Sequence, residues 1–114
     1  MTRQPVNQRA SVKALYVDDF GDRQGVTAGE FNFADGYDGT KDVCILFGCP
    51  CGCGAMQAIH VKPYSGAHAI WSWDGNREAP TCSPSILIHQ LNDAGEKVGE
   101  HWHGFLTAGE FRSC

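Results

Sequence analysis

Hydrophobic residues recur along the chain in short runs, many of them alternating with polar residues, and no long stretch repeats them at helical spacing. Phe31 and Phe33 lie two positions apart, and Trp71 and Trp73 share that spacing, as expected for side chains on one face of a strand. Residues 43–47 are continuously apolar, which is typical of a buried central strand. The pattern predicts a mainly β protein, built as a small antiparallel sheet, sandwich or open barrel. Strands are expected at residues 12–16, 26–33, 43–47, 56–61, 69–73, 86–89 and 101–105.

The segment 80–85 interrupts this pattern because Pro80 and Pro84 each lack a backbone donor. Such a segment belongs at a sheet edge or a bulge, not in a central strand. Ser83 and Ser85 lie in this bend, and no Gly-x-Ser-x-Gly elbow surrounds either of them. We therefore assign both serines a turn role and predict no catalytic residue.

The length of 114 residues suits one domain. Residues 1–10 are polar and are expected to form a loose N-terminal segment, with residues 11–114 as a single β domain. The formal net charge of −4, without a cluster of basic residues, argues against nucleic acid binding. No window approaches the roughly 20 apolar residues of a membrane helix, and no signal peptide is recognisable. We expect a cytoplasmic protein that does not bind membranes and that has the capacity to form homo-oligomers.

The strongest chemical signal is Cys49-Pro-Cys51-Gly-Cys53-Gly, in which three thiols are concentrated in a turn-forming segment. Pro50 and the glycines allow the backbone to turn sharply enough to aim several thiols at one ion. In a reducing compartment clustered thiols favour metal binding over disulfides. The alternative is a set of reduced thiols in a glycine-rich loop, which would be prone to oxidation.

A second half-site is needed to complete a tetrahedral site, and His101 and His103 are the best candidates because alternate residues share one face of a strand. Mixed thiolate and imidazole ligands favour zinc. The sequence thus predicts one Zn²⁺ per chain, held by ligands chosen from Cys49, Cys51, Cys53, His101 and His103. Cys114 competes for the fourth position.

Three blocks carry a resemblance to a known family: the cysteine segment 49–54, the segment 71–86 with its Pro-Thr-x-Ser-Pro-Ser-Ile sequence, and the Trp-His-Gly block within 102–110. Together they resemble a family of small domains of unknown function common in bacteriophage and prophage genomes. The resemblance implies that a residue near the Trp-His-Gly block, here His103 or His101, completes the cysteine site. Some relatives carry an ammonia monooxygenase label, which this chain does not support because it has no membrane-spanning segments.

Two functions follow from a zinc site in a small β protein. The preferred one is a binding or interaction module with a protein partner from host or phage, since a closed four-ligand zinc contributes to folding and leaves no position for substrate. The alternative is a zinc hydrolase or deaminase in which Glu100 or Glu110 acts as general base. The deaminase and metalloprotease motifs are not present, and a thiol redox role fits Cys-Pro-Cys in a β protein poorly.

Overall fold

The computed structural model describes residues 11–20 and 25–114, so the predicted loose segment 1–10 lies outside the described residues. Within these ranges the ordered elements are all strands, which confirms the predicted mainly β class. In the part of the chain that the structure describes, no helix is long and apolar enough to cross a membrane. The strands are β1 (Ser11–Lys13), β2 (Leu15–Tyr16), β3 (Glu30–Ala34), β4 (Cys44–Gly48), β5 (Met56–Val61), β6 (Ile70–Trp73), β7 (Cys82–Ser83), β8 (Ile86–Leu91), β9 (Lys97–Thr107) and β10 (Glu110–Ser113).

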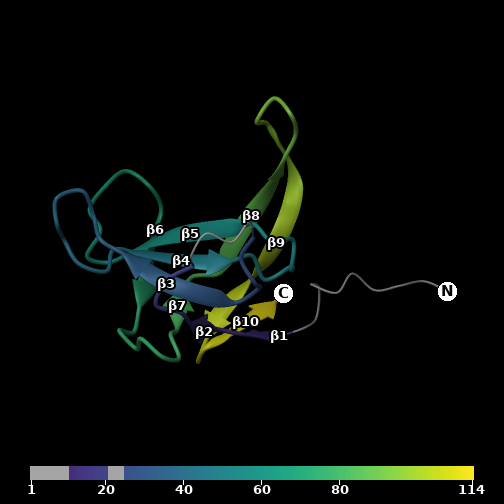
Figure 1. Cartoon of the computed structure of the whole chain (residues 1–114). Coiled ribbons are helices and arrows are strands. Elements are labelled where there is room, and N and C mark those ends of the chain that lie inside the picture. The colour runs from purple at the N-terminus through teal and green to yellow at the C-terminus, as the bar shows by residue number, and fades with distance from the viewer. Residues whose placement is uncertain (1–10, 21–24) are drawn as a thin grey trace.

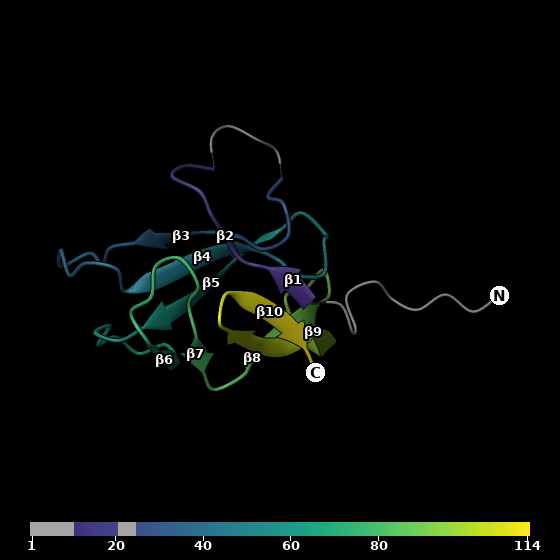
Figure 2. The same ribbon diagram turned by 90° about the horizontal axis from the view of Figure 1, so that it is seen from below.

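The strands form two sheets that together make an open half-barrel (Figure 1, Figure 2). One sheet is antiparallel and has the order β1-β10-β9-β8. The other has the order β2-β3-β4-β5-β6-β7 and is mixed, since β2 pairs with β3, and β5 with β6, in parallel. Ala14 alone separates β1 from β2, so the chain passes directly from one sheet to the other on that side.

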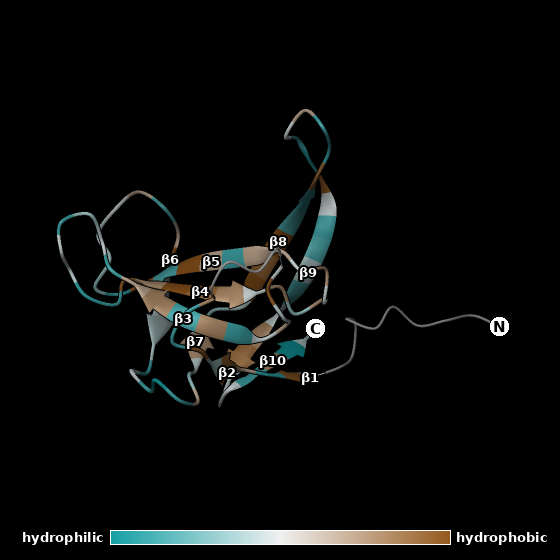
Figure 3. Ribbon diagram, in the orientation of Figure 1, coloured by the Kyte–Doolittle hydropathy of each residue, from teal (hydrophilic) through white to brown (hydrophobic). Residues whose placement is uncertain are grey.

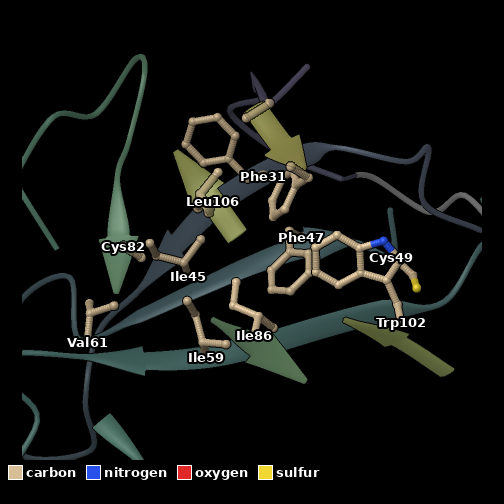
Figure 4. Close-up of a cluster of buried hydrophobic side chains, with 12 residues drawn as sticks. Phe31, Ile45, Phe47, Cys49, Ile59, Val61, Cys82, Ile86, Trp102 and Leu106 are labelled. Atoms are coloured by element: carbon tan, nitrogen blue, oxygen red, sulfur yellow. The ribbon is translucent and has the colours of Figure 1, made fainter. Parts of the chain in front are cut away.

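The hydrophobic core lies between the two sheets (Figure 4). Hydrophobic and hydrophilic residues alternate along β3 (Figure 3), where Phe31 is fully buried while Asn32 is partly exposed. The continuous apolar run at 43–47 is indeed a central strand, β4, because strands pair with it on both sides. Cys49 lies at one end of the core beside Trp102, so the predicted metal segment begins inside the packed interior.

The proline-rich segment 80–85 occupies a sheet edge, as the missing donors predict. Its two-residue strand β7 pairs with β6 and ends that sheet. Pro84 and Ser85 follow and lead into β8, which is the edge strand of the other sheet. The segment therefore carries the chain between the sheets.

The long β8–β9 hairpin contains an irregularity that places the functional residues. Ile88 pairs with Trp102, but the next residue of β8, His89, pairs with Glu100. His101 is thus an extra residue in β9, and the pairing is a β-bulge. One extra residue changes which side chains share a face, because the alternation of a strand has a period of two.

Candidate functional site: a thiol cluster and a serine–histidine pair

The cysteine segment turns back on itself after β4, as its glycines predict. The Gly52 N–H donates to the Cys49 carbonyl at 3.0 Å, and the Cys49 N–H donates to the Ala55 carbonyl at 2.9 Å. Gly52 and Gly54 both have φ near +90°, a conformation that residues with a side chain rarely adopt. This backbone brings three thiols to one side of the loop.

Cys49, Cys51, Cys53 and His101 form a group whose ligand atoms all lie within 4.8 Å of one another. The Cys49 and Cys51 Sγ atoms are 3.3 Å apart, and His101 Nε2 lies 3.1 Å from Cys51 Sγ and 3.5 Å from Cys53 Sγ. A tetrahedral zinc ion spaces its sulfur and nitrogen ligands by roughly 3.4–3.8 Å, given bond lengths of about 2.0–2.3 Å. The four residues could therefore hold a metal ion.

The surroundings of this group suit metal binding. His101 Nδ1 lies 2.9 Å from Gln90 Oε1, and an amide oxygen accepts a hydrogen bond, so Nδ1 carries the proton and Nε2 is left for a metal. Burial raises the pKa of the Cys49 thiol to about 12. Burial also acts to raise the pKa of Cys53, but donation from the Ala55 backbone and contacts with Cys51 and His101 outweigh it and lower that pKa to about 7. The exposed Cys53 thiol thus ionises more readily than the buried Cys49 thiol.

His103, which the sequence predicted as a metal ligand, is not in this group. Its Nε2 lies 3.1 Å from Ser85 Oγ, and its Nδ1 lies 3.8 Å from Glu100 Oε1. The prediction assumed that His101 and His103 share one face of a regular strand. The bulge at His101 breaks that regularity, so the two imidazoles serve different clusters. Cys114, the other candidate ligand, is exposed and also lies outside the group.

The same bulge explains how Glu100 comes near His103. Residues three apart in a regular strand point to opposite faces, whereas the extra residue at position 101 gives Glu100 and His103 a common face. Glu100 is largely exposed, with 66% of its side chain accessible, while His103 is 32% accessible. The resulting set, Ser85, His103 and Glu100, has the residue types of a nucleophile, a general base and an orienting carboxylate.

Sequence reasoning missed this set because it assigned Ser85 a turn role and weighed Glu100 only as the base of a zinc enzyme. The Ser85 backbone does lie in a bend, and its carbonyl accepts a hydrogen bond from Trp71 Nε1 at 3.1 Å. Its hydroxyl, however, faces the imidazole. Ser83, by contrast, lies in β7 and is exposed. The only local signal was a serine beside an apolar strand together with a histidine in the next strand, which is too common to indicate catalysis.

Residues 17–114 match the family model described as bacterial ubiquitination-like system serine protease (BubE). No curated protein and no solved structure shows significant similarity to the chain. The match contradicts both functions expected from the sequence: a serine protease is neither an interaction module nor a zinc-dependent hydrolase or deaminase. The expectation failed because it assigned Ser85 a turn role and based both functions on the metal site.

Proposed function

The chain belongs to the BubE family, and we propose that it is a serine protease that cleaves a polypeptide of a bacterial ubiquitination-like system. The observation that carries the proposal is the 3.1 Å approach of Ser85 Oγ to His103 Nε2, in a chain matched by a serine protease family. This distance is within hydrogen-bond reach, as a nucleophile and its general base require.

In the proposed reaction Ser85 Oγ attacks the carbonyl carbon of a peptide bond while His103 Nε2 accepts the hydroxyl proton. His103 then donates this proton to the leaving amine, and water hydrolyses the acyl-serine by the same proton transfers in reverse roles. Glu100 Oε1 is 3.8 Å from His103 Nδ1, longer than a hydrogen bond. Since catalytic hydrogen bonds are often long before substrate binds, we assign Glu100 the role of orienting the imidazole.

We further propose that the thiol cluster binds zinc in a structural role. Three sulfurs and one imidazole nitrogen are ligands that zinc prefers, and four protein ligands leave no position for a reacting water. A serine protease needs no such water, because its nucleophile is the serine itself. The metal would instead fix the cysteine loop to β9 at His101, two residues from His103.

A fluorophosphonate probe tests the protease assignment, because it reacts covalently with an activated serine and requires no knowledge of the natural substrate. We expect stoichiometric labelling of the wild-type chain at Ser85, located by mass spectrometry of the digested protein, and loss of labelling in Ser85→Ala. Ser83→Ala is the matched control, since this serine lies two residues away and is exposed; it should be labelled like the wild type. Labelling that persists in Ser85→Ala, or that never occurs in metal-loaded protein, would refute the assignment.

A further inference from the structure

β8 is an edge strand whose outer side is open. Its inner side pairs with β9, and among residues 11–20 and 25–114 no other strand pairs with its outer side. Ser85, the proposed nucleophile, directly precedes this strand. A free strand edge presents unpaired backbone groups that an extended chain can use as a template.

The pairing of β9 shows which residue of β8 directs its backbone N–H and C=O toward the open edge. The Cys114 N–H donates to the His103 carbonyl at 2.9 Å, so the backbone groups of His103 point toward β10. His103 is the partner of Leu87, which is therefore in a non-hydrogen-bonded pair of the β8–β9 ladder. The N–H and C=O of Leu87 accordingly point away from β9, toward the open edge. The hydrogen bond from Trp71 Nε1 to the Ser85 carbonyl agrees with this direction. Ser85 lies two residues before Leu87, so its carbonyl also points away from β9, and Trp71 donates to it from that side.

An apolar groove of about 310 Å³ follows this edge. Ile86 and Ile88 of β8 line one side, and Ile59 of β5 and Trp71 of β6 line the other. The groove exists because β5 pairs with β6 only at His60 and Val61, which leaves the first part of β5 unpaired on the side facing β8. Figure 4 shows Ile59 and Ile86 next to each other across the two sheets.

We propose that the polypeptide substrate binds as an extended strand along the outer edge of β8, pairing with the N–H and C=O of Leu87, so that the scissile carbonyl reaches Ser85. This inference rests on the proposed function. An added strand would direct every second side chain into the groove, because side chains alternate in direction along a strand. The substrate class is therefore a segment without regular structure of its own, such as a chain terminus or linker, with an apolar residue near the cleaved bond.

An extended peptide fits this edge better than a second copy of the chain would. The free backbone pair of Leu87 lies two residues from the nucleophile, at the position where a protease must hold the substrate backbone. Exposed apolar side chains also border the proposed catalytic pair: Leu87 and Phe105 are 40% and 45% accessible. They offer contact to the side chains of the added strand that do not enter the groove.

The test uses the full chain and the peptide aldehyde acetyl-Leu-Leu-Leu-Leu-al, which supplies an apolar residue to the groove in either register. Ser85 Oγ adds to the aldehyde carbon, and the hydroxyl proton passes to the former carbonyl oxygen, giving a hemiacetal. Affinity is measured by competition with fluorophosphonate labelling. A set of aldehydes with one N-methylated amide each is compared with the parent, because a methyl group removes the donor and blocks strand pairing.

We expect N-methylation to weaken binding about tenfold or more at alternate amides and little at the amides between them, the two-residue period of a paired strand. Hydrogen exchange at the Leu87 amide should slow when the parent aldehyde binds. The Ile88 amide is the internal reference, since it already faces β9.

Four results would overturn the inference. The first two are an aldehyde that fails to compete and an N-methylation profile without a two-residue period. The third is an unchanged Leu87 exchange rate in the complex. The fourth is a dimer in sedimentation with the Leu87 amide already protected, which would show that a second copy occupies the edge. Normal fluorophosphonate labelling alongside any of these would leave the protease assignment intact, whereas loss of labelling would remove both proposals.

Discussion

The thiol cluster and the serine–histidine pair both depend on β9, yet they are encoded in opposite ways. Three of the four cluster residues lie within the segment 49–53, and cysteines at that density are rare enough to be recognised directly. The pair and its carboxylate are spread over Ser85, Glu100 and His103, all common residue types. Composition reveals the first region. Only the register of the β8–β9 hairpin reveals the second.

His101 and His103 lie only two positions apart, yet one belongs to the thiol cluster and the other to the serine–histidine pair. In an unbroken strand they would face the same way, and both would be plausible ligands. The bulge places His101 against Cys51 and Cys53, with Gln90 behind it, and leaves His103 to Ser85. Bulges commonly redirect side chains next to functional sites, and here one bulge separates a candidate metal ligand from a proposed catalytic base.

Single substitutions of the two histidines by alanine should distinguish the roles of the two regions most clearly. We expect His103→Ala to lower kcat/KM for peptide cleavage on the order of 10⁴-fold or more, because Ser85 loses its base. Its metal content should remain that of the wild type. His101→Ala should lose tightly bound metal, because it removes one of four ligands. Metal content by inductively coupled plasma spectrometry and labelling of Ser85 measure the two effects. Loss of metal from His103→Ala would show that this histidine is a ligand after all.

The cysteines provide the second contrast, in stability. Cys51→Ser should forfeit much of a metal contribution worth on the order of 10 kcal/mol, and the variant should unfold at far lower temperature. Cys82 is the control: it is 3% exposed in the core, and burial raises its pKa to about 12, which keeps it a neutral thiol. Cys82→Ala should therefore cost only about 1–2 kcal/mol, from lost packing.

A chelator distinguishes the two kinds of loss. Thermal unfolding of Cys82→Ala should remain sensitive to EDTA, as in the wild type, while Cys51→Ser should melt at the same temperature with and without it. Equal chelator sensitivity of the two variants would contradict the assignment of Cys51 as a ligand.

Much of the fold could be predicted because its signals are local. The alternation at Phe31 and Phe33 predicted a strand at 26–33, which the structure has as the shorter β3, Glu30–Ala34. The prolines at 80 and 84 correctly placed their segment at a sheet edge. The apolar run at 43–47 predicted a central strand, which the structure has as β4. The sequence did not decide among a single antiparallel sheet, a sandwich and an open barrel. Strand order depends on pairings between distant segments, which no local pattern encodes.

The candidate site was predictable only where its residues are contiguous or chemically rare. The sequence named the three thiols with both His101 and His103 as candidate ligands, and the structure brings only His101 to the thiols, because a bulge that the sequence does not reveal turns His103 elsewhere. Ser85 became recognisable only when β8 paired with β9 and brought an imidazole to its hydroxyl. A serine in a proline-rich bend has no distinguishing chemistry until that partner is in place.

The last and smallest effects concern Glu100, which lies near His103, and Gln90, which contacts His101. Glu100→Gln keeps the shape of the side chain and removes its charge, so the imidazolium formed during catalysis loses its stabilising partner. Because Glu100 is 66% accessible and 3.8 Å from His103, we expect kcat to fall only about 10- to 100-fold, less than for a buried, closely bonded carboxylate. Metal affinity should not change.

Gln90→Ala is the matched control, since it removes the hydrogen bond to His101 Nδ1 and should weaken metal affinity about 10-fold with little change in kcat. Competition with a chromophoric chelator and cleavage kinetics give both values for each variant. If Glu100→Gln retained full kcat, the protease would work as a Ser85–His103 dyad, and the bulge would serve the metal site alone.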